Sequence, residues 1–196
     1  MRGRAAGRTG AGRGVPMLLI TDMISTWDFP DAEKLLPSAR AIAPRIARLK
    51  ARCRAQGVPV VYANDNLGRW RSDLHGLVDR SLTAGGPGAA VTRLLAPDAE
   101  DYVVLKPKHS AFFATPLELL LQDLHAGPLV IAGVASDQCV LVTAAEARMH
   151  DREVIVPRDC VASQGIARTR ASIVHFETVL KIATTPSSRL RLAAAG

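Results

Sequence analysis

Three side chains that could carry out chemistry follow apolar runs of this 196-residue chain: Asp22, Lys108 and Cys139. Such runs are typical of buried strands, and open α/β sheets bind ligands at the carboxyl ends of their strands. Near a thiol, an aspartate can accept the thiol proton, and an ammonium group can stabilise both the thiolate and the carboxylate. Backbone N–H groups in the turn before Cys139 can hold an oxyanion. The three residues therefore predict a base, a cation and a nucleophile in one active site.

Each of these residues also has a plainer interpretation. A lone cysteine is often a small apolar residue under a helix, an aspartate at a strand end often caps a turn or helix, and a lysine is usually a solvated surface charge. Two observations favour catalysis. Cys139 stands where a helix is predicted to begin, and the unpaired amides and dipole of a helix start favour a thiolate. The apolar run 111–113 beyond Lys108 indicates a partly buried setting for that lysine.

Strand-like apolar runs alternate with helical patterns along the chain. Nearly continuous apolar strands separated by helices predict a parallel sheet that is covered on both faces, and right-handed crossovers make this a doubly wound α/β fold. The predicted strands span 15–21, 60–63, 102–105, 129–134 and 154–156, with a weaker sixth over 181–184. The predicted helices span 38–56, 88–95, 116–125, 137–150 and 168–180.

One long irregular stretch, 65–87, interrupts this alternation, and such loops are more often functional than accidental. The aromatic residues Trp27, Trp70, Phe112 and Phe113 are candidate walls of a substrate pocket. Alternatively, each of them packs in the hydrophobic core, because aromatic side chains are prominent in cores as well as in binding sites.

Length and composition predict one domain over 15–196 with a flexible tail over 1–14. Four arginines in that Gly/Arg/Ala-rich tail supply much of the net charge of +7, and the few aromatics of the body are not interleaved with basic residues, so no nucleic-acid partner is expected. No apolar run reaches the length of a membrane span, so no membrane partner is expected. Three widely spaced cysteines predict no disulfide and favour a reducing, cytoplasmic location.

Four ordered segments resemble the isochorismatase-like cysteine hydrolases, the superfamily that includes nicotinamidase, N-carbamoylsarcosine amidase and ureidoacrylate amidohydrolase. They are LLITDM (18–23), VVYANDN (60–66), KPKHSAFF (106–113) and GVASDQCV (133–140). The resemblance implies a six-stranded parallel sheet of order 3-2-1-4-5-6. It also implies that Asp22, Lys108 and Cys139 form the Asp-Lys-Cys triad, that the amides of Ala135 and Cys139 form an oxyanion hole, and that the Val134–Ala135 peptide bond is cis.

The chain departs from one family pattern. Nicotinamidases carry an Asp-x-His metal motif in the segment that begins here at Asp65, and this chain has Leu67 in place of the histidine. The resemblance then implies no metal, no other cofactor, and a substrate other than nicotinamide. His75 is interpreted as a surface residue, because transition-metal sites normally need three or more convergent protein ligands.

These observations predict a hydrolase that cleaves an amide, ureido or carbamoyl C–N bond of a small molecule through a thioester on Cys139. The family's true isochorismatases cleave a vinyl ether without a cysteine nucleophile, so the retained thiol favours attack on a carbonyl carbon. Vinyl-ether hydrolysis remains an alternative, as does a catalytically silent binding protein on the same scaffold. The resemblance also implies a homodimer or homotetramer, in which the loop 65–87 reaches a neighbour's pocket.

Overall fold

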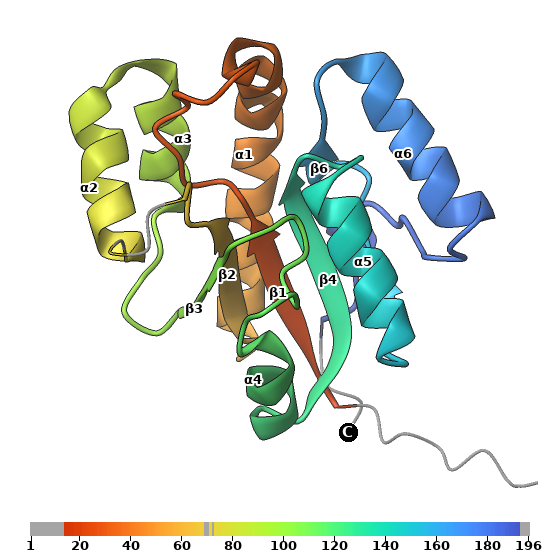
Figure 1. Cartoon of the computed structure of the whole chain (residues 1–196). Helices are drawn as coiled ribbons and strands as arrows, with labels where there is room; N and C mark the ends of the chain where they lie inside the picture. Colours follow the sequence, from red (N-terminus) through yellow and green to blue (C-terminus); the bar gives the residue numbers. More distant parts are fainter. Residues whose placement is uncertain (1–13, 69–70, 72, 193–196) are drawn as a thin grey trace, which may run out of the picture.

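The computed structural model describes residues 14–68, 71 and 73–192, which form a parallel sheet between two layers of helices (Figure 1). The sheet has the order β3-β2-β1-β4-β5, and β6 pairs with β4. The doubly wound α/β prediction is therefore confirmed. The predicted tail over 1–14 lies, except for Gly14, outside the described residues. The strands are β1 (Val15–Thr21), β2 (Val60–Asp65), β3 (Tyr102–Lys106), β4 (Ala126–Val134), β5 (Val154–Ile155) and β6 (Val161–Ala162).

Both faces of the sheet are buried, which explains why its central strands are apolar up to their carboxyl ends. Successive side chains of a strand point to opposite faces. In β1, Leu18 and Ile20 pack into one apolar cluster, and Met17 and Leu19 pack into another. All four side chains are fully buried.

The helices divide between the same two clusters. Helices α1 (Ala32–Ala55), α2 (Leu74–Ala84) and α3 (Gly86–Leu95) pack on the cluster of Leu18 and Ile20. Helices α4 (Leu117–Asp123), α5 (Cys139–Met149) and α6 (Ile166–Thr178) pack on the cluster of Met17 and Leu19. In the part of the chain that the structure describes, no helix is long and apolar enough to cross a membrane.

Three elements differ from the sequence prediction. Helix α1 begins six residues before 38, because Pro37 lies inside the helix rather than ahead of its start. Helix α2 occupies part of the stretch 65–87 that was predicted to be irregular, and its N-cap is Asp73, whose side chain accepts from Gly76 N at 2.6 Å. The strand predicted over 181–184 is reduced to one bridge between Ile155 and Ala183, and the sixth strand of the sheet is instead β6, which the sequence did not predict.

Candidate active site

The parallel register brings the carboxyl ends of the first four strands to one edge of the sheet. Thr21, the last residue of β1, is level with Ala63 of β2 and with Gly133 of β4, and Asp65 of β2 is level with Lys106 of β3. Residues that follow these positions are therefore neighbours in space. Asp22 follows β1 directly, and the short turn after β4 leads to Cys139, the first residue of α5.

Lys106, rather than Lys108, is the cation at this edge. Its Nζ lies 2.8 Å from Asp22 Oδ2 and 3.5 Å from Cys139 Sγ, and its side chain is fully buried. Lys108 is exposed and contributes only its backbone carbonyl, which accepts from Lys106 Nζ at 3.2 Å. The prediction of Lys108 as the cation beside the thiol is therefore wrong.

The physical reason is the alternation of side chains along β3. This strand continues one residue beyond the predicted end at 105, so Lys106 points to the same buried face as Val104. Pro107 then leads the chain out of the sheet, and Lys108 lies on the surface. The two-residue period that places Lys106 on the face of Val104 was the sequence signal that could have identified it.

Asp22 is held by hydrogen bonds at both carboxylate oxygens. Oδ2 accepts from Lys106 Nζ, and Oδ1 accepts from the backbone N–H of Asp65 at 2.7 Å. Burial raises the pKa of Asp22 above its ordinary value, and the Lys106 charge offsets part of this effect. Burial alone would lower the pKa of Lys106, but the charge of Asp22 above all, with that of Asp65, raises it above its ordinary value. The ammonium group therefore persists beside the carboxylate at neutral pH.

Cys139 rests as a neutral thiol. Burial raises the pKa of the thiol to about 12, and the Asp22 charge adds to this, while the Lys106 charge acts in the opposite direction. Burial and the Asp22 carboxylate thus act against the thiolate that the helix start and Lys106 favour. A thiol in this state needs a base, and Asp22 is the carboxylate that interacts with it.

Cys139 should react with iodoacetamide before the other two cysteines. All three cysteines are free, and burial raises the pKa of each to about 12, so the pKa does not discriminate among them. Access of the reagent does discriminate among them, because Cys139 borders a cavity and is 8% exposed, whereas Cys53 and Cys160 are fully buried. Peptide mapping after brief alkylation checks this order. Labelling of Cys160 first would contradict it.

The turn between β4 and α5 carries the two amides assigned to the oxyanion hole. Its Val134–Ala135 peptide bond is cis, as the resemblance implies. The carbonyl of Ala135 accepts from the N–H groups of Gln138 and Val140, at 3.1 and 3.2 Å, which closes the turn. Both Ala135 and Cys139 border the same cavity.

A second set of hydrogen bonds attaches this turn to β6 and α6. Asp137 accepts from the Ser163 hydroxyl and, at 2.5 Å, from Arg168 Nε. The Ser172 hydroxyl donates to the Ser136 hydroxyl at 2.8 Å. These bonds hold the turn in place from outside the cavity.

A cavity of about 240 Å³ opens onto the thiol, and its walls are mostly apolar. Trp27 lines it, as predicted, and packs against Gly88 of α3, where an added Cβ would come within 2.4 Å of the indole Cδ1. The other apolar lining residues are Ile24, Phe29, Leu35, Leu67, Val134 and Ala135, and the polar ones are Asp22, Ser25, Asn64, Asp65, His109, Gln138 and Cys139.

The structure places neither Phe112 nor Phe113 in this cavity. Phe112 is buried in the core on the other face of the sheet and stacks on His150, with ring centroids 5.1 Å apart. Phe113 is 55% exposed. The chain turns away from the sheet edge after Lys106, so Phe112 packs in the core and Phe113 faces solvent. Trp70 lies outside the described residues.

Sequence reasoning missed two residues of the site. His109 lines the cavity, and its Nδ1 lies 3.5 Å from Cys139 Sγ. Asn64 is buried and holds the segment after β1, because its Oδ1 accepts from Ile24 N and its Nδ2 donates to Ile24 O. A buried asparagine at the end of an apolar strand was the signal for Asn64, whereas His109 is exposed and carried none.

EDTA is expected to leave turnover unchanged. Leu67, where nicotinamidases have a histidine, is a cavity wall, and His75 is exposed as predicted. Among the described residues, no cluster of three or more His, Cys, Asp or Glu side chains could hold a metal ion. Assays before and after dialysis against EDTA test the expectation. Loss of activity that a divalent ion restores would contradict it.

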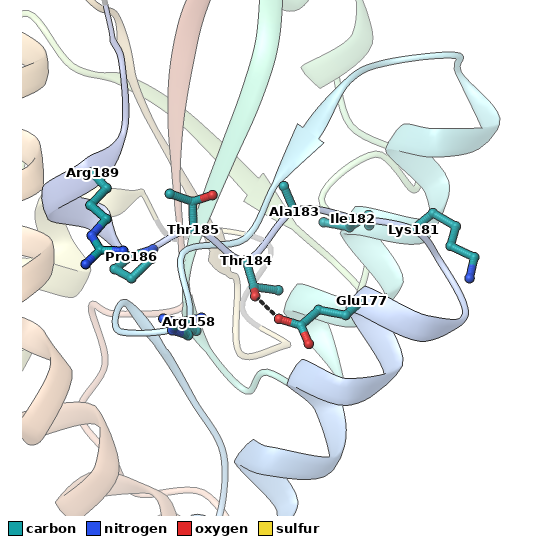
Figure 2. A pocket seen from close by; sticks show the side chains of 9 residues that line it. All are labelled: Arg158, Glu177, Lys181, Ile182, Ala183, Thr184, Thr185, Pro186 and Arg189. Carbon is teal, nitrogen blue, oxygen red and sulfur yellow. Dashed lines mark hydrogen bonds between the residues drawn. The ribbon is translucent and has the colours of Figure 1, made fainter.

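A larger hollow of about 600 Å³ lies beside β5, around the segment 181–186, whose Ala183 forms a bridge with Ile155 (Figure 2). Arg158, Lys181 and Arg189 border it, and Glu177 of α6 accepts a hydrogen bond from Thr184. Its lining contains no cysteine, serine or histidine, so we assign the active site to the cavity at Cys139 instead.

Comparisons with known proteins agree with this geometry. A family model described as the isochorismatase domain matches residues 16–187. The chain is 36% identical over 163 residues to an uncharacterized isochorismatase family protein of Bacillus subtilis, over 83% of this chain and 89% of that protein. It is 32% identical over 165 residues to the maleamate amidohydrolase of Pseudomonas putida, over 80% of this chain and 76% of that enzyme.

The solved structure of an isochorismatase-like hydrolase from Alkaliphilus metalliredigens is similar to this chain with a TM-score of 0.73. The match covers 91% of this chain and 97% of the other, at 22% sequence identity. This likeness confirms the fold.

Proposed function

Because this chain belongs to the isochorismatase family of hydrolases, we propose that it cleaves an amide, ureido or carbamoyl C–N bond of a small molecule, with Cys139 as nucleophile. The observation that carries the proposal is the contact of one buried ammonium group with both a carboxylate and a thiol. Lys106 Nζ lies 2.8 Å from Asp22 and 3.5 Å from Cys139, beside a cavity of small-molecule size.

In the first half-reaction, Asp22 takes the thiol proton as sulfur attacks the substrate carbonyl. The raised pKa of Asp22 suits this transfer, because a more basic carboxylate takes the proton more readily. The raised pKa of Cys139 opposes it, so the thiolate forms only as Lys106 stabilises the developing charge and sulfur bonds to the carbonyl carbon. Lys106 stays charged and compensates the negative charge as it moves between carboxylate and sulfur. The amides of Ala135 and Cys139 stabilise the oxyanion, and the leaving nitrogen takes the proton from Asp22. Water then hydrolyses the thioester.

The relative from Pseudomonas putida supports the C–N bond as target, since its name describes an amidohydrolase. Vinyl-ether hydrolysis is the second candidate, because the family model takes its name from isochorismatase. The thiol distinguishes the two reactions. Alkylation of Cys139 should abolish amide turnover, whereas a reaction that needs no nucleophilic sulfur should lose activity only where the adduct blocks the cavity.

Ammonia release from a panel of small carboxamides and ureido and carbamoyl acids tests the proposal. We expect turnover of at least one compound by the wild type and none by Cys139→Ala. Cys53→Ala is the matched control, since it removes a buried thiol remote from the cavity. A panel that is inert with wild-type protein, or equal turnover by wild type and Cys139→Ala, would overturn the proposal.

Activity should be lost on the acid side as Asp22 takes up a proton. Its pKa is raised by burial, so kcat/KM is expected to fall with decreasing pH through a midpoint above the ordinary value of about 4. On the alkaline side, the raised pKa of Lys106 and the thiol pKa of about 12 keep the profile flat to about pH 9. Initial rates across this range check both limbs. A rate that rises about tenfold per pH unit would instead identify a pre-formed thiolate as nucleophile.

A further inference from the structure

We infer that His109 is the general base of the second half-reaction, in which water hydrolyses the thioester on Cys139. The inference rests on the proposed function and assigns a step that Asp22 would otherwise perform alone. Nδ1 of His109 lies 3.5 Å from Cys139 Sγ, and the residue lines the cavity that opens onto the thiol. Imidazole is the side chain best suited to accept and return a proton near neutral pH.

Asp22 is less accessible to water than His109 in this second step. Both of its oxygens already accept hydrogen bonds, from Lys106 and from the backbone of Asp65, and its side chain is only 16% exposed. His109 lines the same cavity as Asp22, but it is exposed, so water has freer access to its imidazole than to the carboxylate.

The segment that carries His109 is attached on both sides to the elements of the site. On its N-terminal side, Lys106 Nζ donates to the carbonyl of Lys108 at 3.2 Å. On its C-terminal side, Ala111 N donates at 3.0 Å to the hydroxyl of Thr143, on the helix that begins with Cys139. The imidazole is thus positioned relative to the thiol by contacts with both β3 and α5.

The step balances without any co-reactant except water. Nδ1 takes one proton from the water as its oxygen bonds to the acyl carbon of the thioester. The tetrahedral intermediate then collapses, the C–S bond breaks, and the proton on Nδ1 passes to Sγ. The products are a carboxylic acid and the free thiol, and nothing is oxidised or reduced. The short distance from Nδ1 to Sγ serves this proton return.

Pre-steady-state kinetics with p-nitrophenyl acetate separate the two half-reactions, because release of p-nitrophenolate reports acylation. For His109→Gln we expect a burst close to one equivalent per chain at a near-wild-type rate, followed by a steady rate lowered about 10²-fold to 10⁴-fold. Mass spectrometry of acid-quenched samples should find an acetyl group on the Cys139 peptide. Because position 109 is exposed, added imidazole should restore the steady rate of His109→Ala.

Lys108→Gln is the matched control, since it changes an exposed neighbour in the same segment and should alter neither phase. Equal slowing of burst and steady rate in His109→Gln, or no change in either, would overturn the role of His109. A variant that is damaged in folding is recognised by its lost burst and by the failure of imidazole to rescue it. A full burst from Cys139→Ala would contradict the proposed function itself, independently of His109.

Discussion

Replacing Cys139 by alanine is expected to lower turnover at least about a thousandfold while the fold is kept, as removal of a catalytic nucleophile does. The side chain is small and borders the cavity, so its truncation leaves little empty volume in the core. Its sulfur is the atom that Lys106 and His109 both approach at 3.5 Å. No other thiol can replace it, because Cys53 and Cys160 do not line the cavity.

Ammonia release by the purified variant measures this loss, and a thermal melt followed by circular dichroism checks the fold. Cys160→Ala gives the contrasting result, namely lower stability with the chemistry retained. Cys160 is fully buried in the core cluster of Leu18 and Ile20, where a truncation leaves a cavity. Activity of Cys139→Ala above a thousandth of the wild-type value would argue against covalent catalysis.

Lys106→Gln is expected to lower kcat/KM by about a hundredfold or more, a loss typical of a removed electrostatic partner. The substitution leaves the Asp22 carboxylate without its buried cation and removes the charge that stabilises the thiolate as it forms. It should also lower the free energy of unfolding by on the order of 3 kcal/mol, because one member of a buried ion pair is left uncompensated. Steady-state rates and urea unfolding measure the two effects.

Lys108→Gln is the matched control for this prediction. It removes the same charge two residues away, from an exposed side chain, and it keeps the backbone carbonyl that accepts from Lys106 Nζ. We expect near-wild-type rates and stability from it. The reverse result, with a larger loss from Lys108→Gln than from Lys106→Gln, would reinstate the lysine that sequence reasoning selected.

The sequence by itself determined the fold class and two of the three residues at the site edge. The continuous apolar run 15–20 of β1 predicts burial on both faces, and a strand buried on both faces requires helices above and below it. Asp22 and Cys139 could be found because each follows such a run directly or after one short turn. This information is local, since it depends only on the alternation of apolar runs and turns along the chain.

The tertiary structure decided which lysine meets the thiol and what state the thiol is in. The choice of Lys106 over Lys108 depends on where β3 ends, and that end is set by pairing with Asp65 on the neighbouring strand. The raised pKa of Cys139 depends on burial and on the charge of Asp22, and both come from segments far from Cys139 in the chain. His109 joins the site only because β3 and α5 bring its segment to the sulfur. The distances between segments far apart in the chain, and the burial that these segments cause, leave no pattern in the local sequence. Only the folded structure could therefore reveal them.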